Sequence, residues 1–262
     1  MKTVTFEQTG RVGSIVLVDP PDHALSRTFA NDLLAAVHEA SSSDIRVLVV
    51  RATGPNFGTG GFVPEWPGKD RNWFRTFIAE VNQAYTAIEA LRVPTIAAVR
   101  GRAVSGHYEL VLRCDLIVAA DDATFTWVEA DTGMAPLAGG VQRLADRVGR
   151  GRATAQVLLS DSLTSAEAER IGLVNQVVPG AQLDEAVDRL AERLATGPTR
   201  GYAAVRALFK AWSGGGVPSA DQLTLDLTMD LFESTDAQGA FAAVKKAAET
   251  GGGIIRPTFV GT

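Results

Sequence analysis

The chain has 262 residues and a mass of 27.7 kDa, with 46% apolar, 21% charged and 7% aromatic residues. These values are those of an ordinary globular protein, so they exclude collagen-like, coiled-coil and disordered chains. The 30 acidic and 25 basic residues give a formal charge of −5, which argues against nucleic acid or an anionic membrane as the main partner. The single cysteine, Cys114, excludes an internal disulfide framework and an all-cysteine metal site.

The N-terminal segment does not resemble a signal peptide. It lacks an uninterrupted apolar stretch before the polar residues Glu7, Gln8 and Arg11. No segment of the sequence offers the roughly 18 apolar residues that a membrane span requires. We therefore expect a cytoplasmic location and no membrane partner.

Strands and helices are expected to alternate through the first half of the chain. The alternating residues 3–8 and the apolar run 12–18 predict a hairpin, and one apolar face predicts a helix from about Ser26 to Ala40. Nearly unbroken apolar runs are typical of strands buried on both faces, and they cover residues 45–53, 94–101 and 115–120. Further elements are expected at 72–91 (helix), 107–114 (short helix) and 123–127 (short strand). This alternation predicts an α/β fold with parallel strands and helical crossovers.

The second half of the chain is expected to be almost wholly helical. Helical spacing covers residues 140–149, 151–160, 165–172, 183–197, 200–212 and 221–249. The glycine-rich segment 213–218 is expected to be a hinge between the last two helices. We predict a core with the active site over residues 1–197 and a helical C-terminal region over 198–262.

Two segments share one form, a buried strand followed by a glycine-containing turn and a helix or loop. They are residues 49–62 and 96–112. Glycine allows close approach of a ligand to the backbone, and helix starts leave unpaired N–H groups. Two such turns side by side can direct two N–H groups at one carbonyl oxygen, as in an oxyanion hole. The alternative is that the glycines only form tight turns. A phosphate-binding loop is disfavoured because no GxxxxGK[ST] pattern is present.

Two glutamates lie near these turns among apolar neighbours. Glu109 lies in the helix after the second turn, and Glu129 follows the short strand 123–127. Carboxyl groups in apolar surroundings can act as general acids and bases. The competing interpretation makes Glu109 a first-turn acid stabilised by the helix dipole and Glu129 an exposed residue.

Together these features resemble the crotonase, or enoyl-CoA hydratase/isomerase, family over nearly the whole chain. Residues 47–66 are similar to the family's first oxyanion segment, and residues 93–153 are similar to its long central signature. Residues 163–179 and 232–241 are similar to later segments. The resemblance implies a spiral of ββα turns with a helical C-terminal trimerisation region. It also implies a homotrimer or a hexamer made of two trimers.

The resemblance also implies an acyl-CoA substrate and assigns a site. Matched by motif, the oxyanion donors would be the amides of Gly61 and Gly106, and the acid–base pair would be Glu109 and Glu129. The family's hydratases add water to a 2-enoyl thioester, so Glu109 would orient water and Glu129 would deliver a proton to Cα. Coenzyme A would belong to the substrate, with no separate cofactor and no metal. Its adenine end would lie near the residues Ala24, Leu25 and Thr59.

Several positions depart from the family pattern. Phe62 stands where the family usually has Asp, and it would line the acyl pocket or belong to the core. The usual G-G-G is S-G-H over residues 105–107. His107 would add a hydrogen bond to the substrate or narrow the acyl pocket, or else it would only fill a gap or point outward. Trp127 belongs to the core or to the pocket wall, and Val128 replaces the proline usual before the second glutamate.

Other functions of the same superfamily stay open. An isomerase with a third acid is disfavoured because Leu137 stands at the matching position, but a single-glutamate isomerase is compatible with the sequence. A carbon–carbon bond (β-diketone) hydrolase is favoured by His107 and disfavoured by Glu129 and Ala138 at its two catalytic positions. A non-catalytic acyl-CoA binding protein is disfavoured because both glutamates are present.

Overall fold

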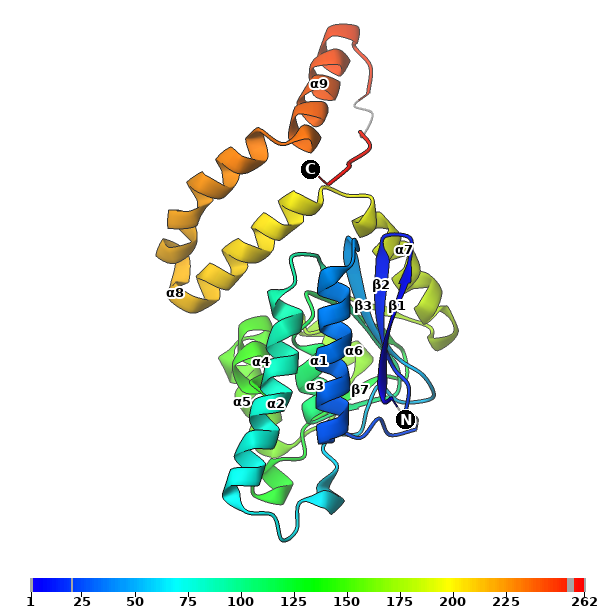
Figure 1. The fold of residues 1–262 in the computed structure, drawn as a ribbon, viewed down its shortest axis with the longest axis vertical. Helices are drawn as coiled ribbons and strands as arrows, with labels where there is room; N and C mark the ends of the chain where they lie inside the picture. The colour runs from blue at the N-terminus through cyan, green and yellow to red at the C-terminus, as the bar shows by residue number, and fades with distance from the viewer. Residues whose placement is uncertain (1, 20, 254–256, 262) are drawn as a thin grey trace. The chain divides into compact units, whose positions relative to one another are not determined.

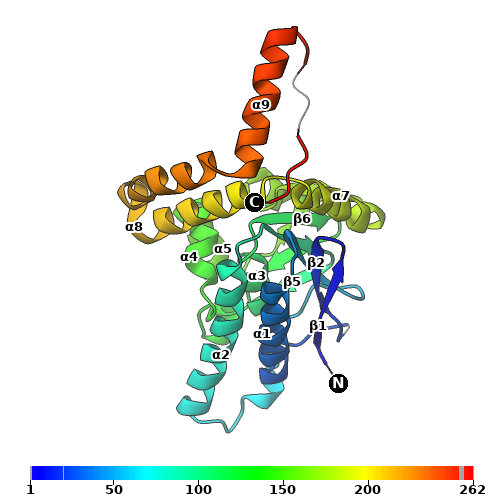
Figure 2. The ribbon, with the colours of Figure 1, turned by 45° about the horizontal axis from the view of Figure 1, so that its top comes forward.

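The computed structural model describes residues 2–19, 21–253 and 257–261. The chain divides into two compact units, one of Met1–Leu91 and Thr95–Ala191 and one of Arg92–Pro94 and Glu192–Thr262. Figures 1 and 2 show the elements of both units in two views. The domain limits expected from the sequence, 1–197 and 198–262, stay a prediction. No helix within the described residues is both long and apolar enough to cross a membrane.

The first unit is built on a six-stranded sheet. Its order is β1 (Val4–Thr9), β2 (Val12–Leu17), β3 (Val47–Ala52), β4 (Thr95–Val99), β6 (Leu116–Ala120) and β9 (Gln176–Val178). Only β1 and β2 pair antiparallel, which confirms the hairpin, and all the later neighbours pair parallel. The three buried strands expected from apolar runs are β3, β4 and β6. The predicted α/β class with parallel strands is therefore confirmed.

A second, smaller sheet has strands that lie between those of the first sheet along the chain. It consists of β5 (Arg102–Val104), β7 (Thr124–Thr126) and β8 (Leu163–Thr164). The chain passes from β4 to β5 through Gly101, which has a φ of +54° and leaves no room for a side chain beside the Pro55 carbonyl. Because β4 pairs with β6 and β5 pairs parallel with β7, the consecutive strands from β4 to β7 alternate between the two sheets. This is the ββα pattern that the resemblance implied.

Two long helices, α1 (Arg27–Ser42) and α2 (Arg71–Ala90), lie side by side in both views of the first unit (Figures 1 and 2). Side chains cap their N-termini: Ser26 accepts the amide of Phe29, and Asp70 accepts the amide of Trp73. The short α3 (Gly106–Val111) is buried along its whole length. These helices confirm the predicted ones. Nearly all of their ends lie within two residues of the predicted ends, and the exception is the C-terminal end of α3.

The remaining helices of the first unit follow in chain order. They are α4 (Gly140–Val148), α5 (Arg150–Leu159), α6 (Ser165–Arg170) and α7 (Leu183–Ala195), with 3-10 turns at η1 (Val63–Glu65), η2 (Ala130–Thr132) and η3 (Gly180–Gln182). A capping box between Thr164 and Glu167 begins α6. The last residues of α7 belong to the second unit.

The second unit contains α8 (Thr199–Phe232) and α9 (Thr235–Thr250). Gly216 interrupts α8 with a φ of +70° and a ψ of −170°, which confirms the predicted hinge. The prediction of one continuous helix over 221–249 is wrong, because α8 ends at Phe232. The Ser234 hydroxyl accepts the Ala237 amide at 3.1 Å and begins a new helix there.

Candidate active site

The two glycine turns lie side by side. The Gly58 amide donates to the Arg102 carbonyl at 2.9 Å, and the Val104 amide donates to the Gly58 carbonyl at 3.0 Å. Gly60, with a φ of +98°, lies so close to the second turn that a Cβ on it would be 3.2 Å from Cβ of Ser105. The arrangement that an oxyanion hole needs, two strand-to-helix turns in contact, is therefore present.

The amides of Gly61 and Gly106 are unused within the part of the chain that the structure describes: neither donates a hydrogen bond there. Leu25 lies between them. Its amide donates to the Gly60 carbonyl at 2.9 Å, its carbonyl accepts the Phe62 amide at 3.0 Å, and its side chain packs on Gly106. The Tyr85 hydroxyl donates to the Gly106 carbonyl at 2.7 Å. The peptide plane that carries the free N–H of Gly61 is thus fixed through the Gly60 carbonyl. The plane that carries the free N–H of Gly106 is fixed through the Ser105 carbonyl, which accepts the Glu109 amide at 2.9 Å.

Glu109 is buried, with 2% of its surface exposed. Its Oε1 accepts the amides of Ala138 at 2.9 Å and of Gly140 at 2.8 Å. Within the described residues, Oε2 accepts no hydrogen bond. The pKa of Glu109 is raised to about 7, and burial is the largest cause. The nearby charge of Glu129 also raises this pKa, whereas the two amide donors and the charge of Arg113 lower it. A carboxyl group with a pKa near neutrality can exchange a proton at physiological pH.

Glu129 is also buried, so the interpretation of it as an exposed residue is wrong. The Ser105 hydroxyl donates to its Oε1, and the Val128 amide donates to its Oε2 at 3.0 Å. A proline at residue 128 would have no N–H to give. The departure from the family pattern at this position therefore supplies a hydrogen bond to the second glutamate.

His107 is buried and faces the core, not solvent. Its Nδ1 accepts the Gly60 amide at 3.3 Å, and its ring meets the rings of Phe29 and Phe57 edge-on. Burial lowers its pKa to about 3, so the imidazole is neutral. The ring fills the space beside Gly58, which agrees with the gap-filling interpretation. A contact with substrate stays a prediction.

The other residues proposed to bind substrate lie around these turns. Thr59 is half-buried and bonds the Asp22 carbonyl through its amide and its hydroxyl, at 3.0 and 3.2 Å. Ala24 is half-buried beside Leu25. Phe62 is 39% exposed, whereas Trp127 is wholly buried against Tyr108, with ring centroids 4.6 Å apart. Their contacts with substrate stay predictions.

An aromatic cluster adjoins the first turn. The Trp66 ring lies 2.7 Å from the position that a Cβ on Gly61 would take. It packs on Phe74 and Phe77, and Trp73 stacks on Phe77 with centroids 5.7 Å apart. These residues therefore form an apolar wall beside the candidate oxyanion donor.

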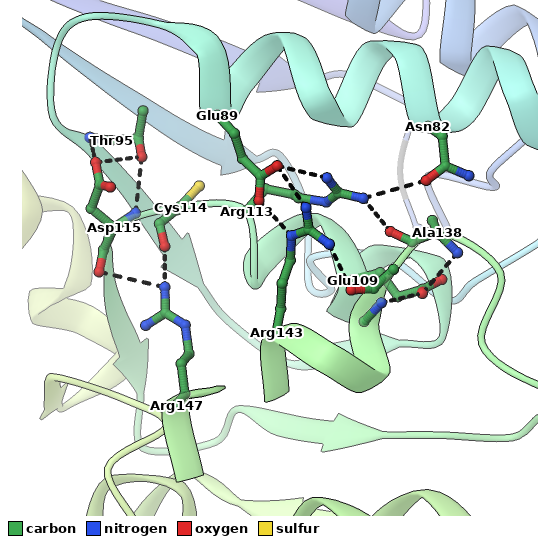
Figure 3. Close-up of polar contacts among 12 residues, drawn as sticks. Asn82, Glu89, Thr95, Glu109, Arg113, Cys114, Asp115, Ala138, Arg143 and Arg147 are labelled. Carbon is green, nitrogen blue, oxygen red and sulfur yellow. Dashed lines mark hydrogen bonds and ion pairs between the residues drawn. The ribbon is translucent and has the colours of Figure 1, made fainter. Parts of the chain in front are cut away.

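Sequence reasoning missed three polar residues of the site. Ser105 holds Glu129, and Arg113 and Glu89 lie behind the segment that holds Glu109 (Figure 3). One signal was available for Arg113, because it is a charge at the end of the apolar run 110–112. Within residues 2–19, 21–253 and 257–261, no group of three or more His, Cys, Asp or Glu is placed to hold a metal ion.

The family model and the individual proteins that are similar to this chain point to the same family. The family model for enoyl-CoA hydratase/isomerase matches residues 7–250. A Mycobacterium bovis protein described as a probable enoyl-CoA hydratase is 35% identical over 200 residues, which cover 76% of this chain and 75% of that protein. A crotonyl-CoA hydratase of Syntrophomonas wolfei is 33% identical over 202 residues, which cover 77% of this chain and 75% of that protein.

Solved structures agree with the sequence relatives. The crystal structure of an enoyl-CoA hydratase subunit I from Geobacillus kaustophilus matches with a TM-score of 0.89 and 31% identity. The match covers 99% of this chain and 98% of that chain. The similarity thus extends over both units of the chain.

Proposed function

The chain belongs to the enoyl-CoA hydratase/isomerase family, and from this premise we propose that it adds water to the double bond of a 2-enoyl-CoA thioester. One observation carries the proposal. Two buried carboxyl groups, Glu109 and Glu129, accompany two adjacent turns with unused amides at Gly61 and Gly106. An acid–base pair beside two N–H donors is what hydration of a conjugated thioester requires.

In the proposed reaction the thioester carbonyl accepts hydrogen bonds from the amides of Gly61 and Gly106. Attack of water on Cβ moves the electron pair of the double bond toward this carbonyl, and the amides stabilise the resulting enolate oxygen. Oε2 of Glu109 orients the water, because Oε1 is occupied by backbone donors. Glu129 passes one proton of the water to Cα, and the hydroxyl stays on Cβ. One complete water molecule is thereby added.

Purified protein can be assayed with crotonyl-CoA and longer 2-enoyl-CoAs by the loss of absorbance of the conjugated thioester. The expected product is the 3-hydroxyacyl-CoA, and Glu129→Gln should lower kcat by about 10²-fold to 10⁴-fold. A product with a shifted double bond would identify an isomerase instead. Absence of turnover with every enoyl-CoA, together with absence of coenzyme A binding, would contradict the proposal.

We include self-association and location in the proposal. The second unit exposes large apolar side chains, with Phe209 65% and Leu225 67% exposed. Such a surface favours burial against other copies of the chain, as a homotrimer or a hexamer. Light scattering after size exclusion would measure the mass in multiples of 27.7 kDa, and a monomeric mass would contradict this part. The expected cytoplasmic location can be tested by fractionation of cells that express the protein.

A further inference from the structure

The segment 137–140 connects the candidate active site to a group of charged side chains behind it (Figure 3). Three successive carbonyl groups of this segment each accept a hydrogen bond from a side chain. The donors are Asn82 Nδ2 to Leu137 at 3.1 Å, Arg113 Nη2 to Ala138, and Arg143 Nη1 to Gly139 at 2.9 Å. The carbonyl side of residues 137–139 is therefore held by side chains from α2, from α4 and from the residues after α3.

The opposite side of the same segment holds Glu109. The amides of Ala138 and Gly140 both donate to Oε1 of this glutamate, at 2.9 and 2.8 Å. Gly139 lies between them with a φ of +80°. A Cβ on Gly139 would lie 2.6 Å from Nη1 of Arg143 and 3.0 Å from Nη2 of Arg113, so the guanidinium groups pack directly on the glycine backbone.

Glu89 joins the two arginines. Its Oε2 accepts Nη1 of Arg113 at 2.8 Å and Nη2 of Arg143 at 2.7 Å, and its Oε1 accepts Nε of Arg143 (Figure 3). The Arg113 side chain is only 2% exposed, whereas those of Glu89 and Arg143 are 27% exposed. A buried ion pair contributes little net stability, because desolvation offsets the attraction. Its geometry is nevertheless well defined, since the guanidinium donors have fixed directions.

We infer that Glu89, Arg113 and Arg143 are positioning residues, which hold segment 137–140 and through it keep Oε1 of Glu109 in place and Oε2 free for the reacting water. We call these three residues the Glu89 clamp. None of them contacts the proposed reacting atoms, so their effect passes through the backbone amides of residues 138 and 140. The inference rests on the proposed hydration.

The charged and titratable groups that act on Glu109 are Glu129, Arg113 and Tyr85. Loosening the clamp weakens the two amide donors that stabilise the ionised carboxyl group. Loss of Arg113 also removes a positive charge beside it. Both changes raise the pKa of Glu109, which burial already holds at about 7. Because the proposed role of Glu109 needs its ionised form, the acid limb of the pH profile should move to higher pH.

Helix α4 offers a matched pair of variants. Arg143→Met removes a clamp residue. Arg147→Met removes an equally half-buried arginine one turn further along, whose Nη2 donates to the Cys114 carbonyl away from segment 137–140 (Figure 3). We expect Arg143→Met to lower kcat by about 10-fold to 100-fold with KM changed by less than about 3-fold. Arg147→Met should keep kcat within about 2-fold of the parent value.

A second measurement does not depend on turnover. The side-chain carboxyl carbon of Glu109 can be titrated by NMR in protein with 13C-labelled glutamate and assigned by its loss in Glu109→Gln. The midpoint near 7 should rise in Arg143→Met and in the isosteric Glu89→Gln, and it should stay unchanged in Arg147→Met. If the protein hydrates no enoyl-CoA, this titration still decides whether the clamp acts on Glu109. An unchanged midpoint in both clamp variants, or equal shifts in Arg143→Met and Arg147→Met, would overturn the inference.

Discussion

The imidazole ring of His107 occupies the space that a side chain on Gly58 would need. A Cβ at residue 58 would lie 2.6 Å from Nε2 of His107 and still closer to two ring carbons. The ring is buried, and Gly58 is fixed by backbone hydrogen bonds to the second turn. Neither residue can move aside without disturbing the two turns, so the two positions are sterically coupled.

Gly58→Ala should therefore destabilise the protein. Overpacking of a buried position by one methyl group costs about 1–3 kcal/mol in the free energy of unfolding. In the double variant with His107→Ala the ring is gone, so the added methyl group should cost much less there. A double-mutant cycle measures the coupling. It compares the chemical denaturation of the parent, of both single variants and of the double variant. Additive losses would contradict the steric coupling.

Ser105 carries a second prediction because it combines a strained backbone with a hydrogen bond to Glu129. Its φ of +52° and ψ of −121° lie in a region that glycine tolerates best. Its hydroxyl donates to Oε1 of Glu129. Ser105→Ala and Ser105→Gly should both lower kcat by about 10-fold or more, because a hydrogen bond to a charged group contributes about 1.5–3 kcal/mol.

The two variants should differ in stability. Ser105→Gly relieves the strained backbone, whereas Ser105→Ala keeps it, so the melting temperature of the glycine variant should be the higher of the two. If kcat followed the melting temperature across both variants, the loss would reflect stability alone. Full activity in either variant would show that the hydroxyl does not support Glu129.

The sequence predicted those elements whose signal is local. Long apolar runs predicted β3, β4 and β6, and capping residues agree with the starts of α1 and α2. The strands β5, β8 and β9 were missed, because two or three residues carry little periodicity, whereas the equally short β7 was predicted as part of the longer segment 123–127. The break between α8 and α9 was missed because a serine inside a helical pattern does not by itself mark a new helix.

The candidate site shows the same limit. Glu109 and Glu129 could be named from the sequence, since each stands among apolar neighbours near a glycine turn. Their hydrogen-bond donors could not, because Ser105 is 24 residues from Glu129 and the amide of Ala138 is 29 residues from Glu109. These pairings arise only when the two sheets and α4 are assembled. Tertiary contacts of this kind decide which of several polar residues acts on a carboxyl group.

The start of α9 gives a prediction for the second unit alone. Ser234 accepts the Ala237 amide at 3.1 Å and donates to the Leu231 carbonyl at 2.6 Å. Ser234→Ala should lower the free energy of unfolding by about 1 kcal/mol. Thr228→Ala is the control, since its hydroxyl donates to the Thr224 carbonyl within α8 and alanine favours a helix. Thermal melts measure the stability of both variants. Equal melting temperatures of the two variants would contradict the capping role of Ser234.

Burial of Glu109 gives a pH dependence of stability with a defined sign. Its pKa is raised from 4.5 to about 7 in the folded protein. Between these two pH values the unfolded chain has released the proton that the folded protein keeps. Folding therefore loses stability as the pH rises through this range, by at most about 3 kcal/mol, and the contribution is constant above it.

Glu109→Gln should remove this dependence, because the amide does not titrate. The free energy of unfolding of the parent, minus that of Glu109→Gln, should fall as the pH rises from about 4.5 to about 7 and then level off. Urea denaturation of both proteins at half-unit intervals of pH measures the difference, and other groups cancel in the subtraction. A difference that rises with pH would mean that the amide donors of residues 138 and 140 outweigh burial, so that Glu109 is ionised well below neutral pH.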